Sequence, residues 1–425
     1  MTATLPSIPR TTDLSAGDPM ASKAPPRERL LSLDVFRGMT VAGMLLVNNP
    51  GSWEHIYPPL EHAPWNGWTP TDLIFPFFLF IAGITTYLSL SARRARGDDE
   101  HAIRSQIIRR GFLIFLFGFL VNGFPYFIWN DIAGIADPTF LQRILARLLN
   151  WRITGVLQRI GIAYLCAALL TQRTTLRQQV YTIAGLLFGY WMVMTVLPVP
   201  GEGGTIGALL LDAPSRTMAA WSDRTMFDWT RWGLGNHLWV GGVTWDPEGF
   251  LSTIPAICTA MLGNLAGRWI GQRRPLTERL SGLFAAGALG MMMGLMWHWV
   301  FPINKSLWTS SYVLFTAGLA CVSLATVMWV VDFQKVRGWT KFFVVYGLNP
   351  MMAFVGSGVM ARCIYSIFKV TKDGKRISLE AGIHETLFTP WLSPTNASLA
   401  FAITFVLFWY AILFYMYKKN IIFKV

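Results

Sequence analysis

The sequence predicts an all-α fold that crosses a membrane many times. Apolar residues make up 53% of the 425 residues, and charged residues make up only 14%. A soluble domain carries roughly a quarter charged residues, and a helix that spans a bilayer needs about 20 consecutive, mostly apolar residues. About ten windows of this kind follow one another along the chain. These observations exclude an ordinary soluble fold and predict a polytopic membrane protein.

The expected spans are joined by short loops, with one long exception. They cover residues 31–49, 70–91, 108–129, 154–171, 180–198, 249–270, 280–300, 309–331, 342–363 and 396–417. Residues 1–28 are rich in Pro, Ser and Thr and contain no apolar signal-peptide core, so we expect a disordered cytoplasmic tail. Residues 29–425 then form one transmembrane domain, with a long outer loop at about 199–248.

The net charge of +13 indicates membrane topology, not a nucleic-acid partner, because most Lys and Arg residues lie in short loops between apolar segments. Basic loops alternate with less basic ones, which places both termini in the cytoplasm and favours a bacterial inner membrane. Two basic segments, 141–152 and 369–376, are expected outside and depart from this pattern. The first has apolar residues at helical spacing, which favours an interfacial helix.

Several well-known chemical motifs are missing from the sequence. The four cysteines lie in or beside apolar runs without CxxC spacing, which is typical of small core residues. There is no phosphate-binding P-loop, no GxSxG, no HExxH and no cluster with metal-ligand spacing. We therefore expect no metal.

The loop between the first two spans is the main candidate for chemistry, because it contains His62, Trp65, Asn66 and Asp72. A histidine can exchange a proton at neutral pH or attack a thioester, although an interfacial histidine solvated by water is the alternative. Asp72 opens the second helix, where it either complements the helix dipole or orients His62. Asn66 either polarises a carbonyl group or caps a loop. The same alternatives apply to two asparagines at the end of the first span, Asn48 and Asn49.

Charged residues inside apolar sequence are the next candidates. Asp34 and Arg37 lie three positions apart at the start of the first span, so an ion pair is expected, with phosphate binding as the alternative for Arg37. Gln158 and Arg159 lie inside an expected span, where an unpartnered Arg costs roughly 2.5 kcal/mol or more. Since Arg suits phosphate oxygens, Arg159 is a candidate for binding an anionic ligand.

Later outer segments hold polar and aromatic residues at the ends of spans. The 199–248 loop is rich in Gly and Trp, which suits either a sugar-stacking surface or a belt of interfacial aromatics. Pro302 and Pro350 indicate broken helix ends of the kind that line cavities. Lys305 is a candidate phosphate or carboxylate contact, although a lone interfacial Lys usually extends toward water. The candidates for substrate binding in these segments are His237, Asn304 and Trp308.

Six motifs in order resemble the heparan-α-glucosaminide N-acetyltransferase family, whose bacterial members include proteins called NagX. They are SLDVFRGMTVAGMLLVN, LEHAPWNGWTPTDLIFPFFLFIAG, GVLQRIGIAYL, WDPEGFLSTIPAI, FPINKSLWTSSYVLFTAG and GLNPMMAF. The resemblance runs from about Leu31 to the C-terminus. It implies a transmembrane acyltransferase that takes acetyl from cytosolic acetyl-CoA and delivers it to the amine of a glucosamine on the far side of the membrane.

The resemblance also implies roles for individual residues. The family's catalytic histidine corresponds to His62, and the asparagine and aspartate of the same motif correspond to Asn66 and Asp72. The asparagine that ends the first span corresponds to Asn48 or Asn49. The arginine of the LQR motif corresponds to Arg159. Beyond the resemblance, we expect donor binding by Arg37, Gln158 and Arg159, and acceptor binding by Asn49, Trp65, His237, Asn304 and Trp308.

Alternatives remain open at this stage. His62 either carries the acetyl group or acts as a general base on the amine in a ternary complex. The chain starts almost directly at its first span, unlike lysosomal members with their long luminal domain, so we expect a periplasmic amino sugar or glycan fragment as acceptor. A homodimer is compatible with the sequence. The rival function is an amino-sugar transporter, which predicts a binding site made by discontinuous helices.

Overall fold

The structure, a computed structural model, describes residues 30–128, 132, 135–372 and 374–423. The predicted tail at 1–28 lies outside these residues. The described part contains fourteen α-helices and one two-stranded hairpin, which confirms the all-α expectation. The first seven helices are α1 (Leu31–Asn48), α2 (Ile74–Ala95), α3 (Glu100–Gly123), α4 (Phe140–Leu149), α5 (Val156–Arg173), α6 (Leu176–Thr195) and α7 (Met218–Phe227).

The second half of the chain adds the remaining helices and the hairpin. The helices are α8 (Thr253–Ile270), α9 (Leu276–His298), α10 (Ser310–Met328), α11 (Thr340–Leu348), α12 (Pro350–Arg362), α13 (Leu379–Leu387) and α14 (Pro394–Lys418). The antiparallel hairpin consists of β1 (Lys369–Lys372) and β2 (Lys375–Ser378), with Val370 opposite Ile377.

Seven helical segments of the described part are long and apolar enough to cross a membrane. They are Leu31–Asn48, Pro70–Ala95, Glu100–Gly123, Leu276–His298, Ser310–Phe333, Pro350–Ile367 and Pro394–Lys418. The other expected windows coincide with α5, α6 and α8, which are helical but are not among these seven. The structure therefore supports a polytopic membrane protein without confirming the predicted number of ten spans.

One expected span, 342–363, is broken in the structure. Helix α11 ends at Leu348, and α12 begins at Pro350 after Asn349, which leaves helical geometry with φ −125° and ψ 52°. Proline lacks an N–H group and disfavours helical geometry in the residue before it, which explains the break. Pro350 lines a cavity, as the sequence predicted for a broken helix end.

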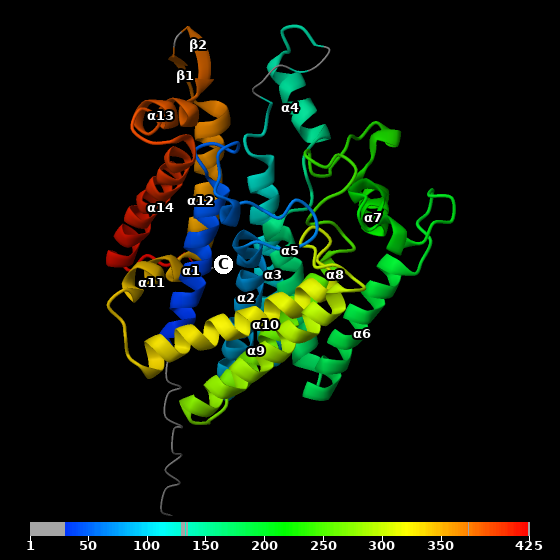
Figure 1. The fold of residues 1–425 in the computed structure, drawn as a ribbon, viewed down its shortest axis with the longest axis vertical. Helices are drawn as coiled ribbons and strands as arrows, with labels where there is room; N and C mark the ends of the chain where they lie inside the picture. The colour runs from blue at the N-terminus through cyan, green and yellow to red at the C-terminus, as the bar shows by residue number, and fades with distance from the viewer. Residues whose placement is uncertain (1–29, 129–131, 133–134, 373, 424–425) are drawn as a thin grey trace, which may run out of the picture.

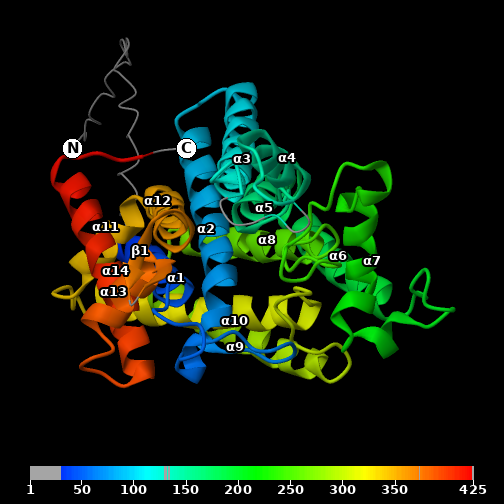
Figure 2. The ribbon, with the colours of Figure 1, turned by 90° about the horizontal axis from the view of Figure 1, so that it is seen from above.

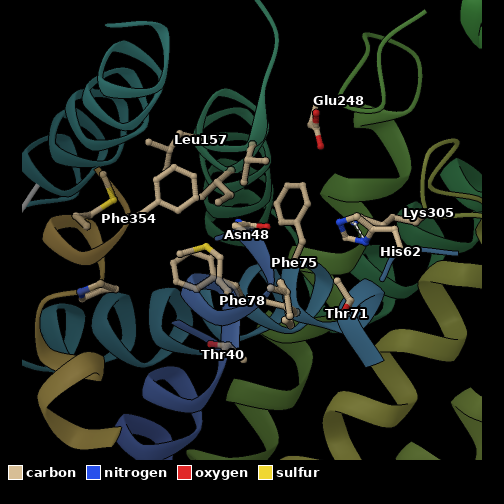
Figure 3. Close-up of a pocket in the computed structure, with 17 residues that line it drawn as sticks. Thr40, Asn48, His62, Thr71, Phe75, Phe78, Leu157, Glu248, Lys305 and Phe354 are labelled. Carbon is tan, nitrogen blue, oxygen red and sulfur yellow. Dashed lines mark hydrogen bonds between the residues drawn. The ribbon is translucent and has the colours of Figure 1, made fainter. Parts of the chain in front are cut away.

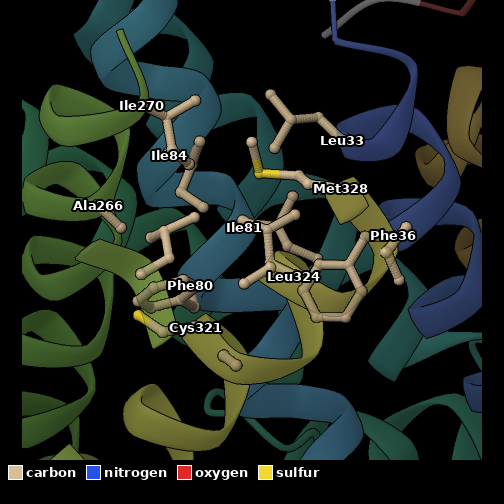
Figure 4. Packing of buried hydrophobic residues seen from close by; sticks show 14 of the residues in the cluster. Leu33, Phe36, Phe80, Ile81, Ile84, Ala266, Ile270, Cys321, Leu324 and Met328 are labelled. Carbon is tan, nitrogen blue, oxygen red and sulfur yellow. The ribbon is translucent and has the colours of Figure 1, made fainter. Parts of the chain in front are cut away.

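Helix α2 lies near the centre of the bundle (Figure 2). Helices α3 and α5 pack on one side of it and α10 on the other, with α9 packed against α10, while α8 lies directly against α2. Leu33 and Phe36 of α1 and Ile81 of α2 belong to the same buried cluster, shown in Figure 4. That cluster also includes residues of α8 and α10, such as Ala266 and Leu324. This apolar packing fixes the helices that surround the cavity described below.

Helix α4 and the β1–β2 hairpin lie at the same end of the molecule (Figure 1). Most of α4 belongs to segment 141–152, and most of the hairpin belongs to segment 369–376. The two basic segments that departed from the charge pattern therefore lie at the same end of the molecule. No residue of α4 is buried, and its apolar Phe140, Leu141 and Leu145 are exposed. An exposed amphipathic helix fits the expected interfacial position.

Candidate active site

Asp72 is fixed at the start of the second span by its local sequence. Pro70 opens a short 3-10 turn, Pro70–Leu73, that leads into α2. The backbone N–H groups of Thr69 and Ala63 each donate to Asp72 Oδ2 at 3.0 Å, and the Tyr312 hydroxyl donates to the Asp72 carbonyl at 2.6 Å. The Asp72 side chain is only 1% exposed. It is thus held in one orientation by groups of the loop and of α10.

The second oxygen of Asp72 faces His62. The distance from His62 Nδ1 to Asp72 Oδ1 is 2.7 Å. Since the carboxylate accepts, we assign the His62 proton to Nδ1, which leaves the lone pair of Nε2 available. Asp72 lies in the turn that leads into α2, where a carboxylate complements the helix dipole, and it also contacts His62, so its position is compatible with both roles that the sequence left open. The His62 side chain is 49% exposed, so its reactive edge remains accessible.

Lys305 completes this group, although it lies far from His62 in the sequence. Its Nζ is 2.9 Å from His62 Nδ1, 3.2 Å from His62 Nε2 and 3.4 Å from Asp72 Oδ1. Because Nδ1–H already points at Asp72, the contact with Nε2 is the one that can be a Lys305 hydrogen bond. Burial lowers the pKa of Lys305, while Asp72 and Glu248 act in the opposite direction. The sequence indicates Lys305 as a candidate phosphate or carboxylate contact but does not assign it to the site. The available signal is its position in an apolar loop, FPINKSLW.

Trp65 and Asn66, which lie in the same loop as His62, connect this loop to distant segments of the chain. Trp65 Nε1 donates to the Leu211 carbonyl at 2.8 Å. Asn66 donates to Asp212 Oδ1 at 2.6 Å and accepts from Asn304 Nδ2 at 3.2 Å. Both polar groups of Asn66 are therefore engaged within the protein. These contacts hold the His62 loop against the Lys305 loop.

A cavity of about 180 Å³ begins at His62 and Lys305 and extends between α1, α2, α5 and α12 (Figure 3). Most of its wall is apolar, including Phe75, Phe78 and Leu157. Its polar wall groups also include Asn48, at the end of α1, and Glu248, on the long outer loop. The structure thus brings His62, Asn48 and, through its contacts with His62, Asp72 to one cavity.

A second cavity, of about 360 Å³, shares Asn48 and Leu157 with the first. It is more polar, and its wall includes Asn49, Gln158 and Arg152. Asn49 donates to the Leu45 carbonyl at 2.8 Å. Gln158 donates to the carbonyls of Ile153 at 3.1 Å and Thr154 at 3.3 Å. Asn49 and Gln158 therefore lie beside the His62 cavity and not within it.

The two arginines predicted to bind the donor have different surroundings. Arg37 pairs with Asp34 at 2.7 Å, as expected, and donates to the Gly347 carbonyl at 2.6 Å. Arg159 is 1% exposed, donates to Ser252 and lies 5.1 Å above the Trp308 ring. Its Nε and Nη1 have no hydrogen-bond partner in the described part of the chain. Neither arginine lines the two cavities, so their phosphate-binding role stays a prediction.

Two other predicted acceptor residues, His237 and Trp308, lie in the protein interior. His237 is 8% exposed; its Nδ1 lies 2.8 Å from the Trp151 carbonyl and its Nε2 3.1 Å from the Leu234 carbonyl. Trp308 is 1% exposed, and its Nε1 donates to Thr259 Oγ1 at 3.1 Å. Neither lines the cavity that contains His62. The surroundings of both residues are those of structural side chains.

The fold and the site together define a polytopic, helical membrane protein with an oriented histidine at the mouth of an intramembrane cavity. A sequence model of the family described as "Heparan-alpha-glucosaminide N-acetyltransferase, catalytic" matches residues 29–201, which include His62 and Asp72. The first half of the chain is thus similar to the catalytic region of the heparan-alpha-glucosaminide N-acetyltransferase family.

Two curated relatives are similar to most of the chain. The heparan-alpha-glucosaminide N-acetyltransferase of Mus musculus is 29% identical over 398 residues, which cover 81% of this chain and 57% of the relative. The protein of the same name from Homo sapiens is 30% identical over 378 residues, covering 80% of this chain and 54% of the relative. The chain thus spans about half the length of the curated relatives it matches.

Proposed function

We propose that this protein is a transmembrane N-acetyltransferase that moves acetyl from cytosolic acetyl-CoA to the amine of a glucosamine-type sugar on the periplasmic side. The observation that carries the proposal is the oriented His62. Asp72 lies 2.7 Å from Nδ1, which leaves Nε2 as the reactive nitrogen beside a largely apolar cavity between helices. The names of the two relatives support the same reaction class.

Two routes use this geometry. In a ternary complex, His62 Nε2 accepts a proton from the amine as the new N–C bond forms and the C–S bond of the thioester breaks; the proton then passes to the sulfur. Alternatively, Nε2 attacks the thioester carbonyl carbon, the C–S bond breaks and the thiolate leaves. The amine then takes the acetyl group from Nε2 and gives up one proton, which neutralises the thiolate. In both routes the ring gains positive charge, which Asp72 compensates through Nδ1–H.

In either route, the Lys305 ammonium must move away from His62 Nε2. Its ammonium lies 3.2 Å from Nε2 and so occupies the side of the ring from which a substrate would approach. When Lys305 turns away from Nε2, it can still pair with Asp72, which lies 3.4 Å away. A displaced ammonium at this position can also donate to the oxygen that gains negative charge when the thioester is attacked.

The apolar cavity suits the acyl end of the donor. Phe75, Phe78 and Leu157 surround a space that runs from His62 toward Pro350 at the break between α11 and α12. The methylene groups of an uncharged chain that carries a thioester can pack against such a wall. Asn48, exposed at the end of α1, is placed to donate a hydrogen bond to the thioester carbonyl.

The membrane placement is part of the same proposal. The alternation of basic loops supports cytoplasmic termini in a bacterial inner membrane, with the His62 loop on the periplasmic side. The donor would then enter the cavity from the cytoplasmic side and the acceptor from the periplasmic side.

One observation favours the transporter alternative and must be tested against the enzyme. Helices α11 and α12 are discontinuous at Asn349, and the break lines the cavity. Discontinuous helices often form the binding sites of transporters. The same break is compatible with a donor passage.

The two functions separate in one experiment. Purified protein in sealed liposomes receives labelled acetyl-CoA and glucosamine, with protein-free liposomes and a His62→Ala preparation as controls. The enzyme predicts label in N-acetylglucosamine with the wild type only. Absence of acetyl transfer together with uptake of glucosamine or N-acetylglucosamine would replace the enzyme with the transporter.

A further inference from the structure

Glu248 is an acidic residue on the wall of the His62 cavity that the proposed mechanism does not use. It belongs to the last part of the long outer loop, just before α8. Its side chain is only 10% exposed, and it lines the cavity together with His62 and Lys305. Figure 3 shows Glu248 apart from the adjacent pair His62 and Lys305, with the carboxylate on another side of the cavity.

A network of hydrogen bonds fixes Glu248 in this wall. Arg152 forms ion pairs with both Glu248 and Asp246, and its Nε lies 2.8 Å from Asp246 Oδ2. The backbone N–H of Glu248 donates to Asp246 Oδ1 at 2.9 Å. Asp223 accepts from the backbone of Asp246 at 3.1 Å and of Phe250 at 2.8 Å. The loop segment 246–250 is therefore anchored on both sides of Glu248.

This network leaves part of the Glu248 charge available to the cavity. Arg152 shares one positive charge between two carboxylates, so its ion pairs cannot neutralise both. The Oε2 atom of Glu248 contacts Arg152, whereas Oε1 makes no hydrogen bond within the described residues. On the other side of the cavity, the nearby cation Lys305 already has its own carboxylate partner, Asp72. A carboxylate with an available oxygen is suited to a small cation.

We propose that Glu248 binds the protonated amine of the acceptor and selects amines over hydroxyl compounds. This inference rests on the proposed function, because an amino sugar reaches the site mainly as an ammonium ion. The ammonium would bind Glu248 Oε1 and pass one proton to it, which leaves the free amine ready for acetyl transfer near His62. The acetylated product is a neutral amide, so it loses the ion pair and leaves more easily. A sugar hydroxyl offers no charge to the same carboxylate.

The test uses Glu248→Gln, because the glutamine carbonyl oxygen can still accept from Arg152 while the charge is removed. The matched control is Glu61→Gln, which alters an exposed acid next to His62 whose side chain makes no hydrogen bond among the described residues. We expect Glu248→Gln to raise KM for glucosamine about 10- to 100-fold and to leave KM for acetyl-CoA within about twofold. The control should leave both values within about twofold.

A binding measurement without acetyl-CoA tests the inference independently of catalysis and of the variant's activity. Glucosamine and glucose are compared as ligands in thermal-shift titrations of wild type, Glu61→Gln and Glu248→Gln, each in its folded form. The expected result is that the wild type and the control prefer glucosamine at least about 10-fold and that Glu248→Gln loses this preference. An unchanged preference in Glu248→Gln would overturn the inference. A wild type that prefers glucosamine but transfers no acetyl would instead overturn the proposed function.

Discussion

His62 and His237 were both predicted to act in the site, and both lie in loops, but the structure gives them opposite surroundings. His62 is half-exposed at a cavity, with Nδ1 beside Asp72 and Nε2 beside the ammonium group of Lys305. His237 is buried, and both of its ring nitrogens face backbone carbonyls of Trp151 and Leu234. A reactive imidazole needs one nitrogen that is oriented and one that can reach a substrate. His62 meets both conditions, whereas His237 joins two loop segments.

The sharpest test of this contrast at His62 is the removal of its orienting carboxylate. In Asp72→Asn, the amide can donate to Nδ1 and thereby favour the tautomer with the proton on Nε2. We expect kcat to fall about 10²- to 10⁴-fold with KM values within a few-fold, as for a loss that acts on the transition state. Steady-state acetyl transfer measures this.

The control for that variant is Asp98→Asn, which alters a partly exposed acid in the loop between α2 and α3 that pairs with Arg93. It should retain kcat within about threefold. An equal loss in both variants would show that Asp72 acts through general structure and not through His62.

Lys305 provides a second, smaller test, because it contacts both His62 and Asp72. Lys305→Met should lower kcat about 10- to 100-fold if the ammonium supports charge development. Burial lowers the pKa of Lys305, so the ammonium is lost at a lower pH than for an ordinary lysine. The alkaline fall of the pH–rate profile should therefore lie below the usual lysine range.

Lys305→Arg sharpens the assignment of that alkaline fall. Arginine does not lose its proton in this range, so the fall should move to higher pH even if the maximal rate drops. A fall that stays at the same pH in Lys305→Arg would assign it to another group.

The smallest expected effect concerns the loop that supports both His237 and Glu248. Burial raises the pKa of Asp223 to about 7, although two backbone N–H donors oppose this. The native state therefore holds this proton at pH values where the unfolded state has released it. The corresponding stabilisation is complete below pH 3.8 and is lost as pH rises to about 7.

Melting temperatures measured from pH 4 to 8 test this contribution of Asp223. The wild type should lose stability across the range, and Asp223→Asn should show a smaller slope. The absolute stability of the variant is expected to be lower, since an amide has only one oxygen for the two backbone donors. An unchanged slope would show that Asp223 does not titrate in this window.

The sequence predicted best what depends on neighbours along the chain. Every expected apolar window overlaps a helix, and the Asp72 cap arises from Thr69 and Pro70 in the same motif. The break at Asn349 also followed from the adjacent Pro350. These features are set by local geometry and hydropathy, which short segments of sequence contain.

The partners of the site residues could not be predicted in the same way. Lys305 reaches His62 from another loop, and Asn66 is engaged by Asp212 and Asn304. These contacts depend on how separate loops fold over the bundle, which spacing along the chain does not encode. Glu248 lies in the WDPEG motif, but the sequence alone indicates no role for it, because only the fold places it on the cavity wall.

The most direct measurement is a paired comparison of His62→Ala and His237→Ala in the acetyl-transfer assay, normalised to folded protein. The account predicts that His62→Ala lowers kcat by about 10³-fold or more without a large change in melting temperature. His237→Ala should keep kcat within about fivefold while losing about 1–3 kcal/mol of stability, because it removes a buried side chain and its hydrogen bonding to the Trp151 or Leu234 carbonyl. Retained turnover in His62→Ala, or equal losses in the two variants, would contradict the account.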